Sequence, residues 1–160
     1  MQPATTLRNW HMDQLRKAIP TLKYVLERAS DEELKSVRDG GDGWTPAEVL
    51  GHLKDFEHVF VQRAHMTMEQ EMADLPFPDH EALVVESKFN DIDIWLVYED
   101  WAAARREFIA FLESITDEEK WEKPAMHPKR GPFTLNDQLF LTVWHDFNHI
   151  EQIIHTLQGA

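Results

Sequence analysis

Three histidines stand at positions from which their side chains could meet inside a helical protein. His145 and His149 lie four residues apart in WHDFNHIEQIIH, and this spacing places both on one face of a helix. His52, in VLGHLKDFE, falls within apolar residues at helical spacing, so we expect it to face the interior. Two imidazoles from one helix and a third from a facing helix can form a three-nitrogen metal site that leaves positions open for water or substrate.

Each of these signals has a simpler explanation when it is taken alone. A single buried histidine is more often a hydrogen-bonded core residue, and nine histidines in 160 residues produce His-x-x-x-His pairs by chance. The combination favours a site, because the last helix also carries a polar stripe beside an apolar one. That polar stripe consists of Thr142, His145, His149, Gln152 and Thr156. We expect one divalent transition metal, Zn or Ni in the first place and Fe or Mn as alternatives.

A di-metal site is the competing hypothesis for the same helices. Asp55-x-x-His58 and Asp146-x-x-His149 mimic the Glu-x-x-His pairs of di-iron bundle proteins. Further carboxylates for such a site would come from Glu99 or Glu107. Because aspartate reaches less far than glutamate, and because this hypothesis leaves two of the three histidines above without a role, we favour the mononuclear site.

Other polar residues lie near the predicted ligands and could serve the site. Candidates for orienting the imidazole rings are Glu48, Asp55, Asp146 and Gln152. A predicted loop that also contains His127 carries a small basic cluster, which consists of Lys120, Lys123, Lys129 and Arg130. This cluster is either a solvated loop or a rim that attracts an anionic cosubstrate, and His127 could reach the site from the same loop.

Four long helices would position these residues, at 5–29, 46–70, 91–114 and 135–158. Thr45-Pro46-Ala47-Glu48 places an N-cap, a proline at the first helical position and a capping glutamate immediately before the second helix. Ser30 and Thr116 open two further capping boxes, and Pro20 is expected to kink or split the first helix. Strand signals are few, and the prolines and glycine of 123–133 predict an irregular loop.

The apolar residues of these helices predict the core. Their helical spacing assigns to the interior Leu7, Trp10, Leu15, Ile19, Leu22, Val25 and Leu26 of the first helix and Ile92, Trp95, Leu96, Trp101, Phe108 and Leu112 of the third. Four amphipathic helices of this kind predict an all-α protein, a four-helix bundle. With no internal repeat or composition change, we expect a single domain over residues 1–160.

Composition excludes several classes of function. The formal net charge of −13, from 29 acidic and 16 basic residues, argues against nucleic acid, which binds basic surfaces. No apolar run approaches the length of a membrane helix, and no secretory signal is recognisable at the N-terminus. There is no cysteine, so any thiol nucleophile must come from outside the chain. We expect a cytoplasmic protein with a small-molecule substrate.

The motifs resemble those of the DinB-like superfamily, also called DinB/YfiT-like. The resemblance rests on Trp44 followed by a helix start and His52, and on a last helix with His145, His149 and Gln152-Ile153. It covers nearly the whole chain, including WAAARREFIAFLESITDEEKW at 101–121. It implies an up-and-down four-helix bundle with unusual connections, a divalent metal held by the three histidines, and a homodimer.

The resemblance also implies a range of activities. The family includes bacillithiol- and mycothiol-dependent S-transferases and the mycothiol-dependent maleylpyruvate isomerase. We therefore expect a metal-binding protein that is a metal-dependent enzyme of the thiol S-transferase or hydrolase kind, with a low-molecular-weight thiol as partner. The alternative is a non-catalytic metal-binding or stress-response module on the same scaffold.

Overall fold

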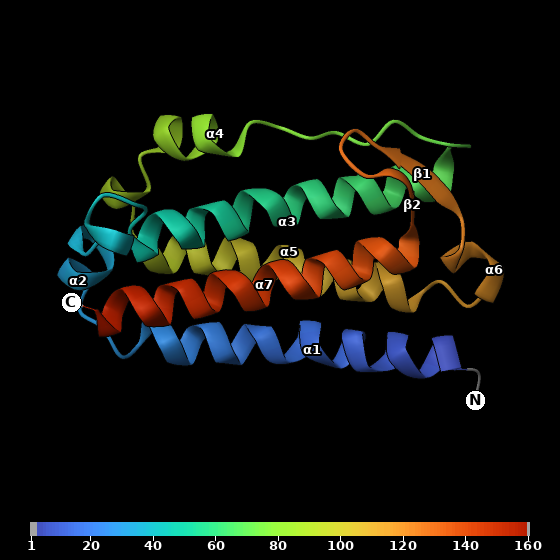
Figure 1. Cartoon of the computed structure of the whole chain (residues 1–160). Helices are drawn as coiled ribbons and strands as arrows, with labels where there is room; N and C mark the ends of the chain where they lie inside the picture. Colours follow the sequence, from blue (N-terminus) through green and yellow to red (C-terminus); the bar gives the residue numbers. More distant parts are fainter. Residues whose placement is uncertain (1–2, 160) are drawn as a thin grey trace.

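Four long helices form the body of the molecule, and they pack side by side (Figure 1). The structure is a computed structural model that describes residues 3–159. The long helices are α1 (Pro3–Leu26), α3 (Pro46–Glu69), α5 (Ile94–Glu113) and α7 (Leu135–Gln158). The predicted four-helix bundle is therefore confirmed, and the two helices that carry the candidate ligands begin and end within one residue of their predicted bounds.

The directions of the helices depart from simple alternation. α1 and α7 run one way, and α3 and α5 run the other way (Figure 1). Contacts of His58 with Asp100 and of His65 with Phe111 pair α3 and α5 in parallel. The up-and-down order that the resemblance implied does not hold for this consecutive pair, whereas the unusual connections that it also implied are present.

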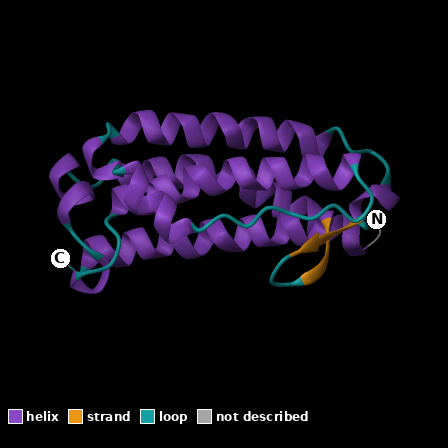
Figure 2. Cartoon of the chain, turned by 90° about the horizontal axis from the view of Figure 1, so that it is seen from above, coloured by secondary structure: helices purple, strands orange, loops and turns teal. Residues whose placement is uncertain are grey.

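A long connection between α3 and α5 makes this parallel arrangement possible. It contains α4 (His80–Ser87) and the short helix η2 (Phe89–Asp91), and it returns along the length of the bundle (Figures 1 and 2). Earlier in the chain, α2 (Asp31–Ser36) and η1 (Asp39–Gly41) join α1 to α3. The connection thereby covers the α3 side of the bundle, where the candidate site lies.

Capping fixes the starts of the two helices that carry the candidate ligands. The Thr45 hydroxyl accepts from the Glu48 N–H of α3, and the Thr134 hydroxyl accepts from the Asp137 N–H of α7. In both cases the acidic side chain accepts the N–H of the capping residue in return, so α3 begins with the predicted capping box and α7 begins with a second one. The box predicted at Thr116 is wrong, because α6 (Glu118–Trp121) is capped by Asp117 instead.

The segment predicted as an irregular loop contains a β-hairpin, which corrects that expectation. Strands β1 (Pro124–His127) and β2 (Gly131–Thr134) pair antiparallel. Gly131 adopts a φ of 74° at the turn, which glycine allows without strain. The hairpin is also held from outside the segment, since the backbone of Met126 bonds to Ala73 and Leu75. Local composition therefore gave no strand signal.

Pro20 does not split α1, which runs unbroken through it. A proline removes one helical hydrogen bond and crowds the preceding turn. The bond that Pro20 removes is the one to the carbonyl four residues earlier. Other carbonyls of the same stretch accept bonds from α5: the Tyr98 hydroxyl donates to the Ile19 carbonyl at 3.0 Å, and Arg105 donates to the Leu15 carbonyl at 3.5 Å. These tertiary contacts anchor α1 near the proline, and of the two predicted effects, a kink or a split, the split is absent.

The core is built from two clusters of buried side chains along the bundle. Most predicted core residues are buried, but Leu7, Trp10 and Leu96 are 51%, 63% and 68% exposed, and Trp95 is also on the surface. Neighbouring positions of the same helices, such as Met12, are buried, so these four side chains lie on the outer sides of their helices. No helix within the described residues is long and apolar enough to cross a membrane.

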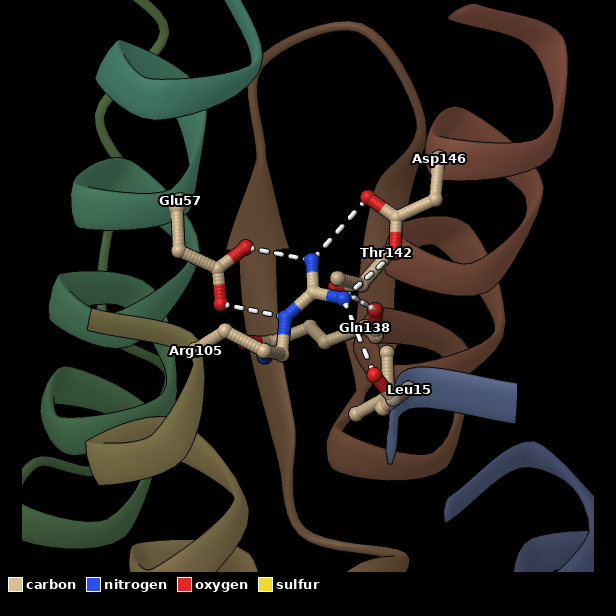
Figure 3. Close-up of polar contacts among 6 residues, drawn as sticks. All are labelled: Leu15, Glu57, Arg105, Gln138, Thr142 and Asp146. Atoms are coloured by element: carbon tan, nitrogen blue, oxygen red, sulfur yellow. Dashed lines mark hydrogen bonds and ion pairs between the residues drawn. The ribbon is translucent and has the colours of Figure 1, made fainter. Parts of the chain in front are cut away.

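A buried ion triad links three of the long helices (Figure 3). The Arg105 guanidinium of α5 donates to both carboxylate oxygens of Glu57 on α3, at 2.7 and 2.6 Å. It also donates to both oxygens of Asp146 on α7, at 2.6 and 2.9 Å. Asp146 is the residue next to His145, so the triad fixes the position of α7 along its axis relative to α3.

Candidate metal centre

The structure brings the three predicted histidines together between α3 and α7. One ring nitrogen of each of His52, His145 and His149 lies within 4.8 Å of the others. The Nε2 atoms of His52 and His145 are 2.9 Å apart. Among the described residues this is the one group of three or more His, Asp or Glu side chains with ligand atoms so close. His52, which lies 93 positions before His145 in the sequence, thus joins the two histidines of α7 in one cluster.

Burial keeps the three rings neutral. It lowers the pKa of His52 to about 3, with His149 and His80 adding to the effect. Burial lowers the pKa of His145 well below its usual value, followed by the influence of His149 and His52. The pKa of His149 is also lowered by burial. Each ring therefore has an unprotonated nitrogen at neutral pH, which is the form that binds a metal.

Hydrogen bonds fix the tautomer of His149. The Asp39 carboxylate can only accept, so Gln152 must direct its Nε2 to it, at 2.9 Å. The Gln152 Oε1 is then the atom that faces His149 Nδ1 at 2.8 Å. Because an amide oxygen only accepts, His149 Nδ1 carries the proton and donates this hydrogen bond. His149 Nε2 is thereby left with a free lone pair, as a metal ligand requires.

The donor set fits a divalent transition metal. A hydrogen bond between His52 and His145 would account for two of the three rings, whereas a metal ion binds a lone pair from each of them. Three neutral imidazoles that leave further positions open are typical of catalytic zinc sites. His52 packs between Trp44 and Phe56, and His145 packs against Phe56 and Phe60, so aromatic side chains hold these two rings in place.

The cluster faces a cavity of about 700 Å³. Its walls next to the histidines are apolar, formed by aromatic rings including Trp44 and Phe60. Acidic side chains line one end, namely Asp39, Asp42 and Glu81, and basic or hydrogen-bonding side chains line the other, namely Arg63, His127 and Arg130. A small molecule in this cavity would contact the histidines and a charged group at the same time.

Some lining residues were not singled out by the sequence. His80 lies with its ring 5.6 Å from that of His52, although it had no partner at a ligand spacing in the sequence. Asp39 reaches the site through Gln152. Both belong to the short elements around α3, whose packing no periodicity reveals. His127 does line the cavity, as its place in the loop suggested.

The structure separates the other candidate residues from the cluster. Of the four predicted orienting side chains, only Gln152 forms a hydrogen bond with a histidine of the cluster. Glu48 completes the cap of α3, Asp55 pairs with Lys54, and Asp146 pairs with Arg105. His58 contacts Asp100 at the surface. The pairs of the di-metal hypothesis are therefore not assembled.

Sequence comparison places the chain in a family. The sequence model of the DinB superfamily matches residues 14–153. This chain belongs to the DinB superfamily. No functionally curated protein matches it.

Solved structures of the same fold include proteins with described activities. YfiT from Bacillus subtilis, described as a probable metal-dependent hydrolase with an unusual four-helix bundle topology, superposes with a TM-score of 0.88 at 23% identity, over 99% of this chain and 89% of YfiT. The mycothiol-dependent maleylpyruvate isomerase superposes with a TM-score of 0.74 at 11% identity. That match covers 96% of this chain but 63% of the isomerase chain. At these identities the likeness establishes the fold.

Proposed function

We propose that this protein binds one divalent transition metal through His52, His145 and His149, and that it is a metal-dependent enzyme of the thiol S-transferase or hydrolase kind. The observation that carries the proposal is the meeting of three neutral imidazoles at the wall of a cavity. The descriptions of YfiT as a probable metal-dependent hydrolase and of the isomerase as mycothiol-dependent support the same class of chemistry.

The ligand set narrows the choice of metal. Imidazole suits Zn and Ni, which we propose first, while Fe and Mn stay as alternatives. When bound, such an ion acts as a Lewis acid that lowers the pKa of a coordinated water or thiol. The chain itself contains no cysteine, so a thiol nucleophile would be a separate small molecule.

The side chains around the three histidines would position the reactants. Gln152 holds His149 in one tautomer, and the rings of Trp44, Phe56 and Phe60 keep His52 and His145 in place. The same rings exclude water from one side of the site, which strengthens electrostatic interactions there. Turnover of an electrophile such as an epoxide with an added low-molecular-weight thiol would separate an enzyme from the non-catalytic alternative.

Metal content is the test of the proposal. Protein purified without an affinity tag, which could itself introduce nickel, should contain about one divalent transition metal per chain by elemental analysis. Protein without metal should take up Zn or Ni at the same ratio on titration. A preparation that contains no metal and takes up neither ion would contradict the metal site.

The wider assembly is also part of the proposal. We propose that residues 1–160 form a single domain and that two copies associate through the outer face of α1 and α7. That face carries the exposed aromatic side chains Trp10, Phe140, Trp144 and Phe147. A groove of about 610 Å³ runs between the two helices beneath them. Exposed aromatic clusters of this kind mark interaction surfaces.

A further inference from the structure

Unpaired positive charge gathers at one end of the cavity. Arg63 and Arg130 line it there, beside His127. Within residues 3–159, no carboxylate lies within ion-pair distance of Arg63, Lys129 or Arg130. The chain has 29 acidic and 16 basic residues, so counter-ions are abundant in the molecule. Their absence at this end means that Arg63 and Arg130 face the cavity without neutralisation.

His127 adds a buried donor that has no acceptor. Its Nδ1 accepts the backbone N–H of Lys129 at 3.1 Å, so the neutral ring carries its proton on Nε2. Burial, followed by the nearby Arg63, lowers the pKa of His127 to about 4, which keeps the ring neutral at pH 7. The side chain is 1% exposed, and Nε2 has no hydrogen-bond partner among the described residues. Buried polar groups are normally paired, so this N–H points to a ligand.

Arg63 is anchored in a way that leaves part of its guanidinium available. Its Nε and Nη2 both donate to the Pro76 carbonyl, at 2.9 and 2.7 Å, and its Nη1 has no partner in the described chain. The side chain is 2% exposed. Burial, with a contribution from Arg130, lowers the pKa of Arg63 to about 10, so it stays cationic at neutral pH. A fixed guanidinium with a free N–H is suited to an oxyanion.

We propose that Arg63, His127 and Arg130 bind one oxyanion group, a carboxylate or a phosphate, of the small molecule that occupies the cavity. The carboxylates of Asp39, Asp42 and Glu81 at the opposite end would repel the same group and so set the ligand's direction. Of the predicted basic cluster, the subsite contains Arg130 but not Lys129. The Lys129 ammonium lies over the Phe77 ring at 4.3 Å and is not among the cavity-lining residues.

The subsite is within reach of the histidine cluster. Phe60 separates the two, with its ring 5.2 Å from the His145 ring and 5.8 Å from the Arg63 guanidinium carbon. The stretch of α3 from His52 to Arg63 is roughly 16 Å long at the rise of an α-helix. A ligand that reaches both ends therefore needs a short chain between its oxyanion and its reacting group. Of the ligand's two contacts, only the one with the histidine cluster rests on the proposed metal function.

Calorimetry with matched ligands tests the subsite on the protein as purified. Hexanoate should bind more tightly than hexanamide, which has the same shape without the charge. Hexyl phosphate, measured in parallel, identifies which oxyanion the subsite prefers. Equal affinity for hexanoate, hexyl phosphate and hexanamide would overturn the proposal. Metal content is measured on the same sample, so that the two proposals can fail separately. Tighter binding of the anions in a sample that contains no metal contradicts only the metal site. Bound metal with equal binding of the charged and uncharged ligands contradicts only the subsite.

Single substitutions locate the effect. Arg130→Gln should weaken hexanoate binding by on the order of tenfold, the loss of one charge-assisted hydrogen bond, and leave hexanamide binding unchanged. His127→Phe, which keeps the ring and removes the donor, should also reduce the preference for hexanoate. The matched control is Arg106→Gln, which changes the net charge equally at an exposed position outside the cavity. An equal loss in Arg106→Gln and Arg130→Gln would indicate a general field effect and overturn the subsite.

Discussion

The three histidines of the cluster are held in two different ways. Aromatic packing positions His52 and His145, whose rings contact Phe56 at 4.7 and 5.6 Å between centroids. A hydrogen bond positions His149, through Gln152. Packing restricts the plane of a ring, whereas a hydrogen bond also selects which nitrogen carries the proton. The contribution of each neighbour to metal binding should differ accordingly.

Replacement of any one of the three proposed ligands should remove most of the metal affinity. We expect His52→Ala, His145→Ala and His149→Ala each to lose bound metal in competition with a chelator, because two imidazoles alone hold the ion weakly. Gln152→Leu should bind metal about 10–100-fold more weakly, the usual cost of removing a hydrogen bond that orients a ligand. Elemental analysis after dialysis against the chelator provides the measurement.

Two other histidines serve as controls for these variants. His58 and His155 lie on the same helices as the ligands but are largely exposed, so His58→Ala and His155→Ala should retain the metal. If His58→Ala loses the metal while His52→Ala keeps it, the di-metal hypothesis becomes the better one.

At the scale of the helices, two arrangements set the geometry of the site. The antiparallel contact of α3 with α7 brings His52 opposite His145, and the buried triad of Arg105 with Glu57 and Asp146 fixes that contact (Figure 3). Gly51, next to His52, allows a close approach as well: a Cβ at this position would lie 2.1 Å from the Phe89 ring. Both features depend on partners from distant elements.

Loss of the central cation should destabilise the bundle. Arg105→Met leaves Glu57 and Asp146 buried without a partner, and we expect the free energy of unfolding to fall by about 3–5 kcal/mol. Urea denaturation of the metal-free protein measures this change without a contribution from metal binding. Arg106→Met, at the exposed neighbouring position, should change stability by about 0.5 kcal/mol or less. Equal stability of the two variants would mean that the triad is not a stabilising link.

At the scale of the whole molecule, the cavity on one side of α7 and the groove on its other side share one lining residue. Trp144 lines both the cavity at the histidines and the groove between α1 and α7. In a homodimer formed through the α1 and α7 face, this tryptophan would lie between the interface and the site. Association could therefore affect the shape of the cavity.

A charge placed on that face should prevent association. Phe147 is 68% exposed there, and Phe147→Lys should convert a dimer into a monomer in sedimentation velocity, because a lysine cannot be buried unpaired in an interface without cost. Val85→Lys is the control, since Val85 is 75% exposed on α4, on the opposite side of the bundle from α1 (Figure 1). A wild-type protein that sediments as a monomer at every concentration would contradict the homodimer.

Much of the candidate site could be predicted from sequence because its signals are local. The Thr45 and Thr134 caps fixed where α3 and α7 begin, and helical spacing then placed His52, His145 and His149 on inner faces. The family motifs gave the same three residues. Arg63 and Arg105 also occupied inner positions of their helices, which was a signal of buried charge, but spacing does not reveal which side chains a buried charge meets.

Tertiary structure alone decided the remaining features. The hairpin forms because Met126 bonds to Ala73 and Leu75, and α1 continues through Pro20 with support from Tyr98 and Arg105. The parallel direction of α3 and α5 follows from the path of the connection between them. Tertiary packing also brings Arg63 of α3 to the same end of the cavity as His127 and Arg130 of the hairpin. Contacts between residues far apart in the chain leave no periodic trace in the sequence, so only their assembly in space shows them.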